Sequence, residues 1–284
     1  MGGLHNEKNM MLEALHKKIL EIALDFDIFC KENDITYYLM GGSALGAVRH
    51  QGFIPWDDDF DVFMDRENYL KFIQVAKSKL DTSKYYFQEE DTEEWPLFFS
   101  KIRMNNTTFI EKDVVDRKMH HGIYIDVMCL NYAFENKFLR RVQYLSARIL
   151  SSSALSKKGY ITNSKIKKIL LLASRVLTAG PLKNMLLSFV RINNSNKTSL
   201  VGHFFGRAPF PKTTFPVDFL SEPRYTSFEG ISLPVPKEVE RYLVVRYGNK
   251  YMELPSKEEM AKYPSHAHIV DTKKSYKKYI YDES

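Results

Sequence analysis

A predicted strand that runs into a double glycine and a helix start constrains this chain more than any other feature. Residues 35–40 (ITYYLM) are rich in β-forming side chains and are followed by Gly41-Gly42-Ser43 and a short helical segment at 44–49. A strand, a glycine turn and a helix N-terminus in this order gather backbone N–H groups, which is a way of binding phosphate. The sequence therefore predicts a phosphate-type site near residue 42.

Three aspartates on predicted strands form the candidate catalytic group. Asp59 and Asp61 are two positions apart in the segment 59–64 (DFDVFM), so both carboxylates point to one face of a strand. Oxygen ligands at this spacing select a hard divalent cation, Mg²⁺ or Mn²⁺. Asp126 lies in the apolar segment IYIDVM, where a buried carboxylate needs a cation or a donor. Solvated acid pairs at strand edges, and a strand Asp paired with a core Arg or His, are the alternative interpretations.

The periodicity along the chain predicts an α/β (α+β) fold with a mixed sheet. Apolar residues recur at helical spacing in three segments: 7–33, 66–80 and 236–247. Further strands are expected at 85–88, 98–104, 107–111, 123–128 and 225–233. We expect residues 1–135 to form the catalytic core, 136–200 a basic amphipathic helical insertion, and 201–284 a C-terminal part that completes the catalytic domain.

The positive charge is concentrated in one part of the chain. The chain has 41 Lys and Arg against 35 Asp and Glu, and every charged residue between Asn136 and Val217 is Lys or Arg. Residues 163–180 also place Ile, Leu and Val at helical spacing, which suits an anionic membrane surface. A packed helical insertion with solvated lysines is the alternative. Aromatic and glycine residues are too sparse between the charges to predict a nucleic-acid partner.

Composition predicts a globular cytoplasmic protein. An apolar content of 44% is enough for a buried core, and two cysteines cannot form a disulfide framework or a Cys-rich zinc site. The N-terminal residues lack the apolar stretch of a secretion signal, and the longest apolar runs are too short to span a bilayer. We therefore expect a cytoplasmic protein that is peripheral at the inner face of the cytoplasmic membrane.

A longer motif resembles a known family. Residues 41–64 (GGSALGAVRHQGFIPWDDDFDVFM) closely resemble the signature of the LicD family, the bacterial cholinephosphotransferases. Residues 121–127 (HGIYIDV) and 247–255 (YGNKYMELP) resemble its later motifs in the same order. The resemblance implies a nucleotidyltransferase-like core and the transfer of phosphocholine from CDP-choline to a sugar hydroxyl of a cell-surface glycan precursor. The precursor would belong to teichoic acid, lipopolysaccharide or capsule.

The resemblance also assigns roles to residues. Asp59 and Asp61 become the metal-binding pair, and Asp126 the third carboxylate, which either completes the ligands of the metal or takes the hydroxyl proton. The candidate substrate-binding residues are Gly42, Ser43, Arg49, Lys101, Arg103 and His121. Lys101 and Arg103 share one strand face that could hold a diphosphate, although an exposed face with solvated charges has the same pattern. The sequence does not decide which of Asp57 and Asp58 has a role.

The same residues leave other functions open. The expected partners are CDP-choline or a related CDP-alcohol, a lipid-linked glycan acceptor and an anionic membrane surface. The fukutin-related proteins share the core and move ribitol phosphate, so transfer of ribitol or glycerol phosphate from a CDP-polyol is an alternative. A nucleotidyltransferase acting on a small molecule is another. A membrane-associated binding protein without catalysis is a third, against which the intact acids argue.

Overall fold

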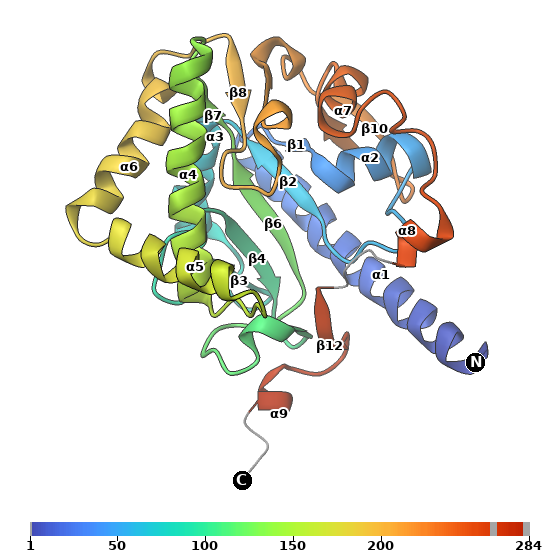
Figure 1. Cartoon of the computed structure of the whole chain (residues 1–284). Coiled ribbons are helices and arrows are strands. Elements are labelled where there is room, and N and C mark those ends of the chain that lie inside the picture. The colour runs from blue at the N-terminus through green and yellow to red at the C-terminus, as the bar shows by residue number, and fades with distance from the viewer. Residues whose placement is uncertain (1, 262–265, 281–284) are drawn as a thin grey trace.

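The computed structural model describes residues 2–261 and 266–280 (Figure 1). The helices are α1 (Gly2–Glu32), α2 (Gly41–His50), α3 (Arg66–Lys79), α4 (Lys137–Lys158), α5 (Lys165–Leu177), α6 (Pro181–Arg191), α7 (Val239–Tyr247), α8 (Lys257–Ala261) and α9 (Lys277–Ile280). The strands are β1 (Tyr38–Leu39), β2 (Asp61–Met64), β3 (Tyr85–Gln88), β4 (Ser100–Met104), β5 (Thr108–Glu111), β6 (Tyr124–Cys129), β7 (Asn131–Tyr132), β8 (Leu200–Gly202), β9 (Thr214–Pro216), β10 (Arg224–Phe228), β11 (Ile231–Val235) and β12 (Ala267–Asp271).

A mixed five-stranded sheet forms the centre of the molecule. Its strand order is β1-β2-β6-β4-β3, with β2 parallel to β6 and the other neighbours antiparallel. The apolar residues Val62, Ile102 and Ile125 are buried in the main core, to which α1 contributes Leu15, Ile19 and Ile22. The alternation of side chains along a strand then directs the polar residues of β2, β4 and β6 to the opposite face. The site described below lies on that face.

The basic helical segment packs beside this sheet around a second, smaller core that it shares with residues from elsewhere in the chain. In Figure 1, α4, α5 and α6 lie on one side of the sheet, and α2 and α7 lie on the other. Ala147, Leu150 and Ala154 of α4 pack with Trp95 in a cluster separate from the main core. Ion pairs join α6 to the segment after β3, because Lys183 contacts Asp91 and Arg191 contacts Glu90. The segment therefore contacts the rest of the molecule through both apolar packing and ion pairs.

The short sheets connect the C-terminal part to the N-terminal part. The strands β7, β8 and β9 form one antiparallel sheet, and β12 pairs with β5. The C-terminal part thus completes structure that begins before residue 135, while the division of the chain into three parts stays a prediction.

The predicted fold class is confirmed, with three local differences. Helix α2 begins at Gly41, so the predicted glycine turn is the first turn of the helix. The strand expected from Asp59 begins at Asp61. The single strand expected at 225–233 is a hairpin of β10 and β11, because Glu229 and Gly230 both take positive φ angles and reverse the chain.

Truncation of a central core residue tests the sheet assignment. Ile125 on β6 is fully buried, so Ile125→Ala should lower the free energy of unfolding by about 2–5 kcal/mol. Leu70 on α3 is half exposed, and Leu70→Ala should change it by no more than about 0.5 kcal/mol. Urea denaturation followed by circular dichroism measures both. Equal losses in the two variants would contradict the burial of β6.

Candidate active site

The register of the sheet places three charged side chains in one row. Asp61 on β2 lies beside Asp126 on β6, and Asp126 lies beside Lys101 on β4. Neighbouring residues in register point to the same face of a sheet, so two carboxylates and one ammonium group share the face that is not packed against the main core. Asp59 precedes β2 and lines the same cavity. The three aspartates singled out in the sequence are therefore brought together.

The N-terminus of α2 lies against the same carboxylates, and this explains the double glycine. A Cβ atom on Gly41 would lie 3.1 Å from Oδ2 of Asp61, and one on Gly42 would lie 2.8 Å from Oδ2 of Asp57. Gly41 also has a φ of +60°, which a side chain would strain. The free N–H groups of a helix N-terminus favour negative charge. Glycine is therefore required here for the acids to approach the backbone.

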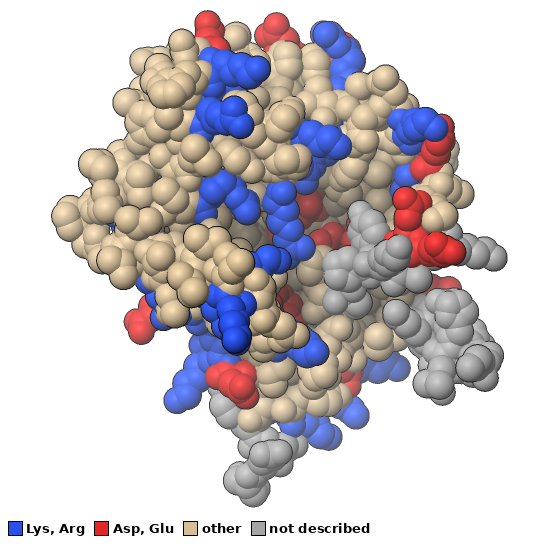
Figure 2. Space-filling view, in the orientation of Figure 1, with Lys and Arg blue, Asp and Glu red and all other residues tan. Residues whose placement is uncertain are grey.

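A cavity of about 490 Å³ opens above these residues. Its floor is acidic and includes Asp57, Asp59, Asp61 and Asp126. Its remaining wall carries basic residues from several elements, namely Lys101, Arg148, Lys158, Arg207, Lys212 and Arg246. Figure 2 shows the hollow with acidic side chains inside it and Lys and Arg side chains beside its opening. The arrangement suits a ligand that carries phosphate groups and meets the acids through a cation.

The aspartates at the floor of the cavity lie close together and are shielded from solvent. Removal from water, together with the charges of Asp59 and Asp58, raises the pKa of Asp57 to about 8. The pKa values of Asp59 and Asp61 are also raised, chiefly by burial and further by the neighbouring carboxylates. Each ionised carboxylate therefore makes ionisation of the others more costly. A positive ion that enters the floor of the cavity would relieve this repulsion.

Lys101 and Asp126 form a buried ion pair at one end of the floor. Nζ of Lys101 donates to Oδ1 of Asp126 over 2.6 Å and lies 3.2 Å from the centre of the Tyr124 ring. Burial lowers the pKa of Lys101 to about 8. Beyond it, Lys158 of α4 contacts Glu111 at 2.5 Å, and the pKa of Glu111 falls to about 2 despite its burial, because Lys101 and Lys158 favour its charged form. The basic helical segment thus supplies part of the cavity wall.

Asp58 lies next to the floor of the cavity and contacts other parts of the chain. Its Oδ1 contacts Nδ1 of His266 at 2.8 Å, and its Oδ2 accepts the backbone N–H groups of His266 and Ala267. Nδ1 of His266 also lies 3.8 Å from Asp59. The hydrogen bond to Asp58 raises the pKa of His266. Asp58 therefore ties the segment before β12 to the site, while Asp57 lines the cavity.

Four of the predicted substrate contacts have other partners. Arg49 donates to the backbone carbonyls of Tyr251 and Glu253, which joins the motif at 41–64 to the motif at 247–255. Arg103 is buried and donates to Gln88 and to the carbonyl of Gly122, so it does not offer an exposed diphosphate site.

The other two are His121 and Ser43. His121 is buried and bonds through Nε2 to the carbonyl of Arg117, and it is absent from the described lining of the cavity. The Ser43 hydroxyl accepts the N–H of Asp61 and so positions the strand that carries this aspartate. Arg49, Arg103 and His121 therefore have partners within the chain, and their contact with substrate stays a prediction. Gly42 and Lys101 do line the cavity.

The donor set fits a divalent cation through two carboxylates. Among residues 2–261 and 266–280, no three His, Cys, Asp or Glu side chains are already arranged as ligands of one metal ion. Asp59 and Asp61 nevertheless supply only oxygen atoms, and burial raises their pKa values, so their charged forms are costly without a cation beside them. Mg²⁺ is commonly held by one or two carboxylates together with water and substrate phosphates. Asp126 differs from this pair because Lys101 already contacts one of its oxygens.

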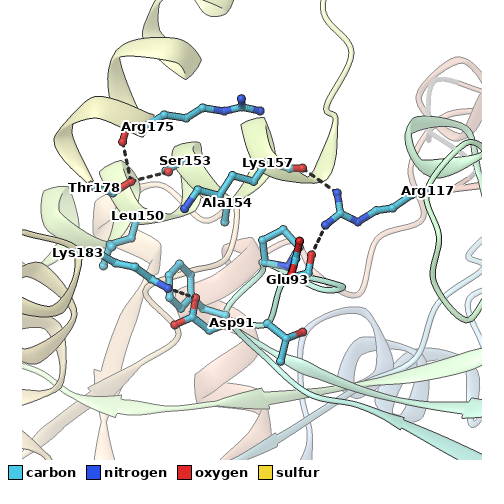
Figure 3. Close-up of a pocket in the computed structure, with 13 residues that line it drawn as sticks. Asp91, Glu93, Arg117, Leu150, Ser153, Ala154, Lys157, Arg175, Thr178 and Lys183 are labelled. Carbon is cyan, nitrogen blue, oxygen red and sulfur yellow. Dashed lines mark hydrogen bonds and ion pairs between the residues drawn. The ribbon is translucent and has the colours of Figure 1, made fainter. Parts of the chain in front are cut away.

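A second cavity, of about 430 Å³, lies between α4, α5, α6 and the segment after β3 (Figure 3). Three of its four basic side chains have partners within the chain. Lys183 pairs with Asp91, Arg117 donates to the carbonyls of Glu93 and Lys157, and Arg175 donates to the carbonyl of Ser156. None of the aspartates of the first cavity lines it. The first cavity is therefore the candidate active site.

Sequence reasoning missed the residues that come from distant elements. These are Glu111, Arg148, Lys158, Arg207, Lys212, Arg246 and His266. The acid-free composition of the region from 136 to 217 was the available signal for Arg148, Lys158, Arg207 and Lys212. It indicated an anionic partner without showing which cations face the candidate active site.

The comparison with protein families agrees with this geometry. Residues 34–144 match the model of the LicD/FKTN/FKRP nucleotidyltransferase domain, which confirms the resemblance to the LicD family. This match spans the part of the chain that carries Asp59, Asp61 and Asp126. Among individual proteins, it is 28% identical over 259 residues to the lipopolysaccharide cholinephosphotransferase LicD of Haemophilus influenzae, a match that covers 89% of this chain and 95% of that protein. A shorter match, 48% identical over 44 residues, relates 16% of the chain to 14% of an uncharacterised protein of Rickettsia typhi.

The crowding of the acids predicts how stability depends on pH. Because the pKa of Asp57 is raised in the folded state, the folded protein binds a proton that the unfolded chain releases. In the presence of a chelator, the melting temperature should therefore fall as the pH rises from about 5 to about 8. Differential scanning calorimetry should show a smaller fall for Asp57→Asn and an unchanged fall for the surface control Asp116→Asn. Stability that rises over this range, or identical slopes for both variants, would contradict the raised pKa.

Proposed function

We propose that this chain is a metal-dependent phosphotransferase that moves phosphocholine from CDP-choline to a sugar hydroxyl of a cell-surface glycan precursor. The observation that carries the proposal is the cavity that Asp59 and Asp61 line together with basic residues, with Asp61 beside the N-terminus of α2. The similarity to a cholinephosphotransferase over most of the chain supports the choice of transferred group. In the reaction, the acceptor oxygen bonds to the phosphorus that bears choline, the bond from that phosphorus to CMP breaks, and CMP leaves.

The residues of the floor would hold the reacting groups. Asp59 and Asp61 would bind Mg²⁺ or Mn²⁺, which would neutralise the diphosphate of the donor when bound. The N–H groups at the start of α2, near Gly42, would face the donor phosphates. Lys101 fixes one oxygen of Asp126, which positions this carboxylate to take the proton of the acceptor hydroxyl. Catalysis would then depend on position and on charge stabilisation.

The wall of the cavity favours choline over a polyol. Its aromatic residues include Phe63, Phe98, Phe205, Phe215 and Tyr247, and the rings of Phe98 and Phe205 are stacked with centres 4.5 Å apart. Aromatic faces bind quaternary ammonium groups through cation–π attraction, whereas ribitol and glycerol would need hydrogen-bond partners there. A panel of CDP-alcohols, incubated with purified protein, Mg²⁺ and an acceptor glycolipid, separates these donors by the release of CMP. Release from CDP-ribitol or CDP-glycerol alone would select the alternative.

Substitution of the metal-binding pair tests the chemistry. Asp59→Asn and Asp61→Asn should each lower the rate of transfer by at least about a thousandfold, because several kcal/mol of transition-state stabilisation depends on the ion. Asp116→Asn, a change of the same kind at an exposed site, should leave the rate unchanged. A chelator should stop transfer, and Mg²⁺ or Mn²⁺ should restore it. Full activity in the chelator would reject the metal.

Substitution of the basic wall tests donor binding separately. Arg207 and Lys212 are exposed at the cavity, so Arg207→Gln and Lys212→Gln should each raise the KM for the donor about fivefold. The kcat should change little, because these residues contribute equally to the ground state and the transition state. Steady-state kinetics at two salt concentrations measures the effect, with the exposed Lys237→Gln as the control. A fall in kcat without a change in KM would argue against a role in binding.

A further inference from the structure

Helix α5 points its apolar face toward solvent and packs against the protein through small polar residues. Ile166, Ile169 and Val176 are 72%, 66% and 76% exposed, whereas Ser174 and Thr178 are buried. The other strongly exposed apolar residues of this helix are Leu170, Leu172 and Leu177. A helix on the surface of a globular protein ordinarily buries its apolar stripe.

The inner face of α5 packs through hydroxyl groups. Thr178 and Ser153 of α4 share a hydrogen bond of 2.6 Å, visible in Figure 3, and the Ser174 hydroxyl donates to the carbonyl of Leu171. Arg175 donates to the carbonyl of Ser156, also on α4. The contacts of Thr178 and Arg175 with α4 hold α5 in this orientation, and its apolar stripe points outward.

We propose that the outer face of α5, with the start of α6, is a docking surface for an anionic lipid bilayer. The charged residues of α5 are all basic, namely Lys165, Lys167, Lys168 and Arg175. An apolar stripe flanked by Lys and Arg is the pattern of a helix that lies in the headgroup region, with its apolar side chains among the acyl chains. Figure 2 shows few charged side chains over the outer surface of α5 and α6, and no acidic ones are expected there from the sequence.

The helix that follows extends the same surface. Met185 of α6 is 60% exposed, and Ile192 just after it is 52% exposed. In the described part of the chain, no single helix is long and apolar enough to cross a membrane, but the pair Lys165–Leu177 and Pro181–Ser195 meets that test together, with a bend of 95°. A bent apolar pair of this kind fits shallow insertion into one leaflet.

Charge favours lipid over a second copy of the chain. In a symmetric dimer through this face, the basic residues of one α5 would face those of the other with no acid between them, which is unfavourable. An anionic bilayer supplies the opposite charge. This inference rests on α5 and not on the proposed function, so vesicle binding and transferase activity can fail independently.

Vesicle co-sedimentation of the full chain tests the docking surface. The test variant carries Ile166→Ser, Ile169→Ser and Val176→Ser, and the matched control carries Leu24→Ser, Ile28→Ser and Leu70→Ser, which are exposed apolar residues of α1 and α3. Partition onto vesicles that contain phosphatidylglycerol should fall at least about tenfold in the test variant and stay unchanged in the control. Lys165→Gln, Lys167→Gln and Lys168→Gln should weaken binding to these vesicles and leave the weak binding to pure phosphatidylcholine unchanged.

A fluorescence measurement keeps the proposal testable if a triple variant folds poorly. The Leu172→Trp variant should show a blue shift and quenching by brominated phosphatidylglycerol, while Leu70→Trp should show neither. Equal vesicle binding by the test variant and the wild type, or no binding at all, would overturn the proposal. A different result would instead identify a self-association surface. In that case the wild type would not bind vesicles and would be a dimer in sedimentation equilibrium, and the test variant would be a monomer.

Discussion

The arrangement of the candidate active site depends on several carboxylates that lie close together and largely buried at the floor of one cavity. Asp61 and Asp126 are neighbours on parallel strands, and Asp57 and Asp59 come from the loop before β2. Burial, and further the repulsion between the carboxylates, raises the pKa values of Asp57, Asp59 and Asp61. A fold keeps such an arrangement only if other contacts stabilise it, and functional sites are where this cost is commonly accepted. The glycines of α2, the Ser43 hydroxyl and Lys101 each hold one part of the acidic floor.

The basic segment has two faces with different surroundings. Through α4 it contributes Arg148 and Lys158 to the wall of the cavity, and Lys158 pairs there with Glu111. Through α5 it presents an apolar and basic surface to the outside. Helix α4 contacts both the cavity and α5, so the proposed membrane surface and the proposed catalytic site share one rigid element.

Local sequence patterns were sufficient to predict most of the helices and strands and the acids at the floor of the cavity. The spacing of Asp59 and Asp61 predicted a shared direction, and both residues line the cavity although β2 begins only at Asp61. The substrate contacts were harder to predict. Arg103 has the same spacing from Lys101 as a diphosphate clamp. The two strands beside β4 nevertheless give it other partners, namely Gln88 of β3 and the carbonyl of Gly122, which precedes β6. Spacing along one strand cannot show which neighbouring strand covers it.

The sequence by itself determined the strand, glycine and helix order, the acid pair and the concentration of positive charge, because each of these depends on residues close together along the chain. Only the tertiary structure decided that Asp126 lies beside Asp61 and contacts Lys101, because strand order is set by the packing of the whole sheet. It also decided that the apolar stripe of α5 points outward. Amphipathic spacing identifies a face of a helix, whereas the hydroxyl contacts of Ser153 and Thr178 determine which face meets the protein.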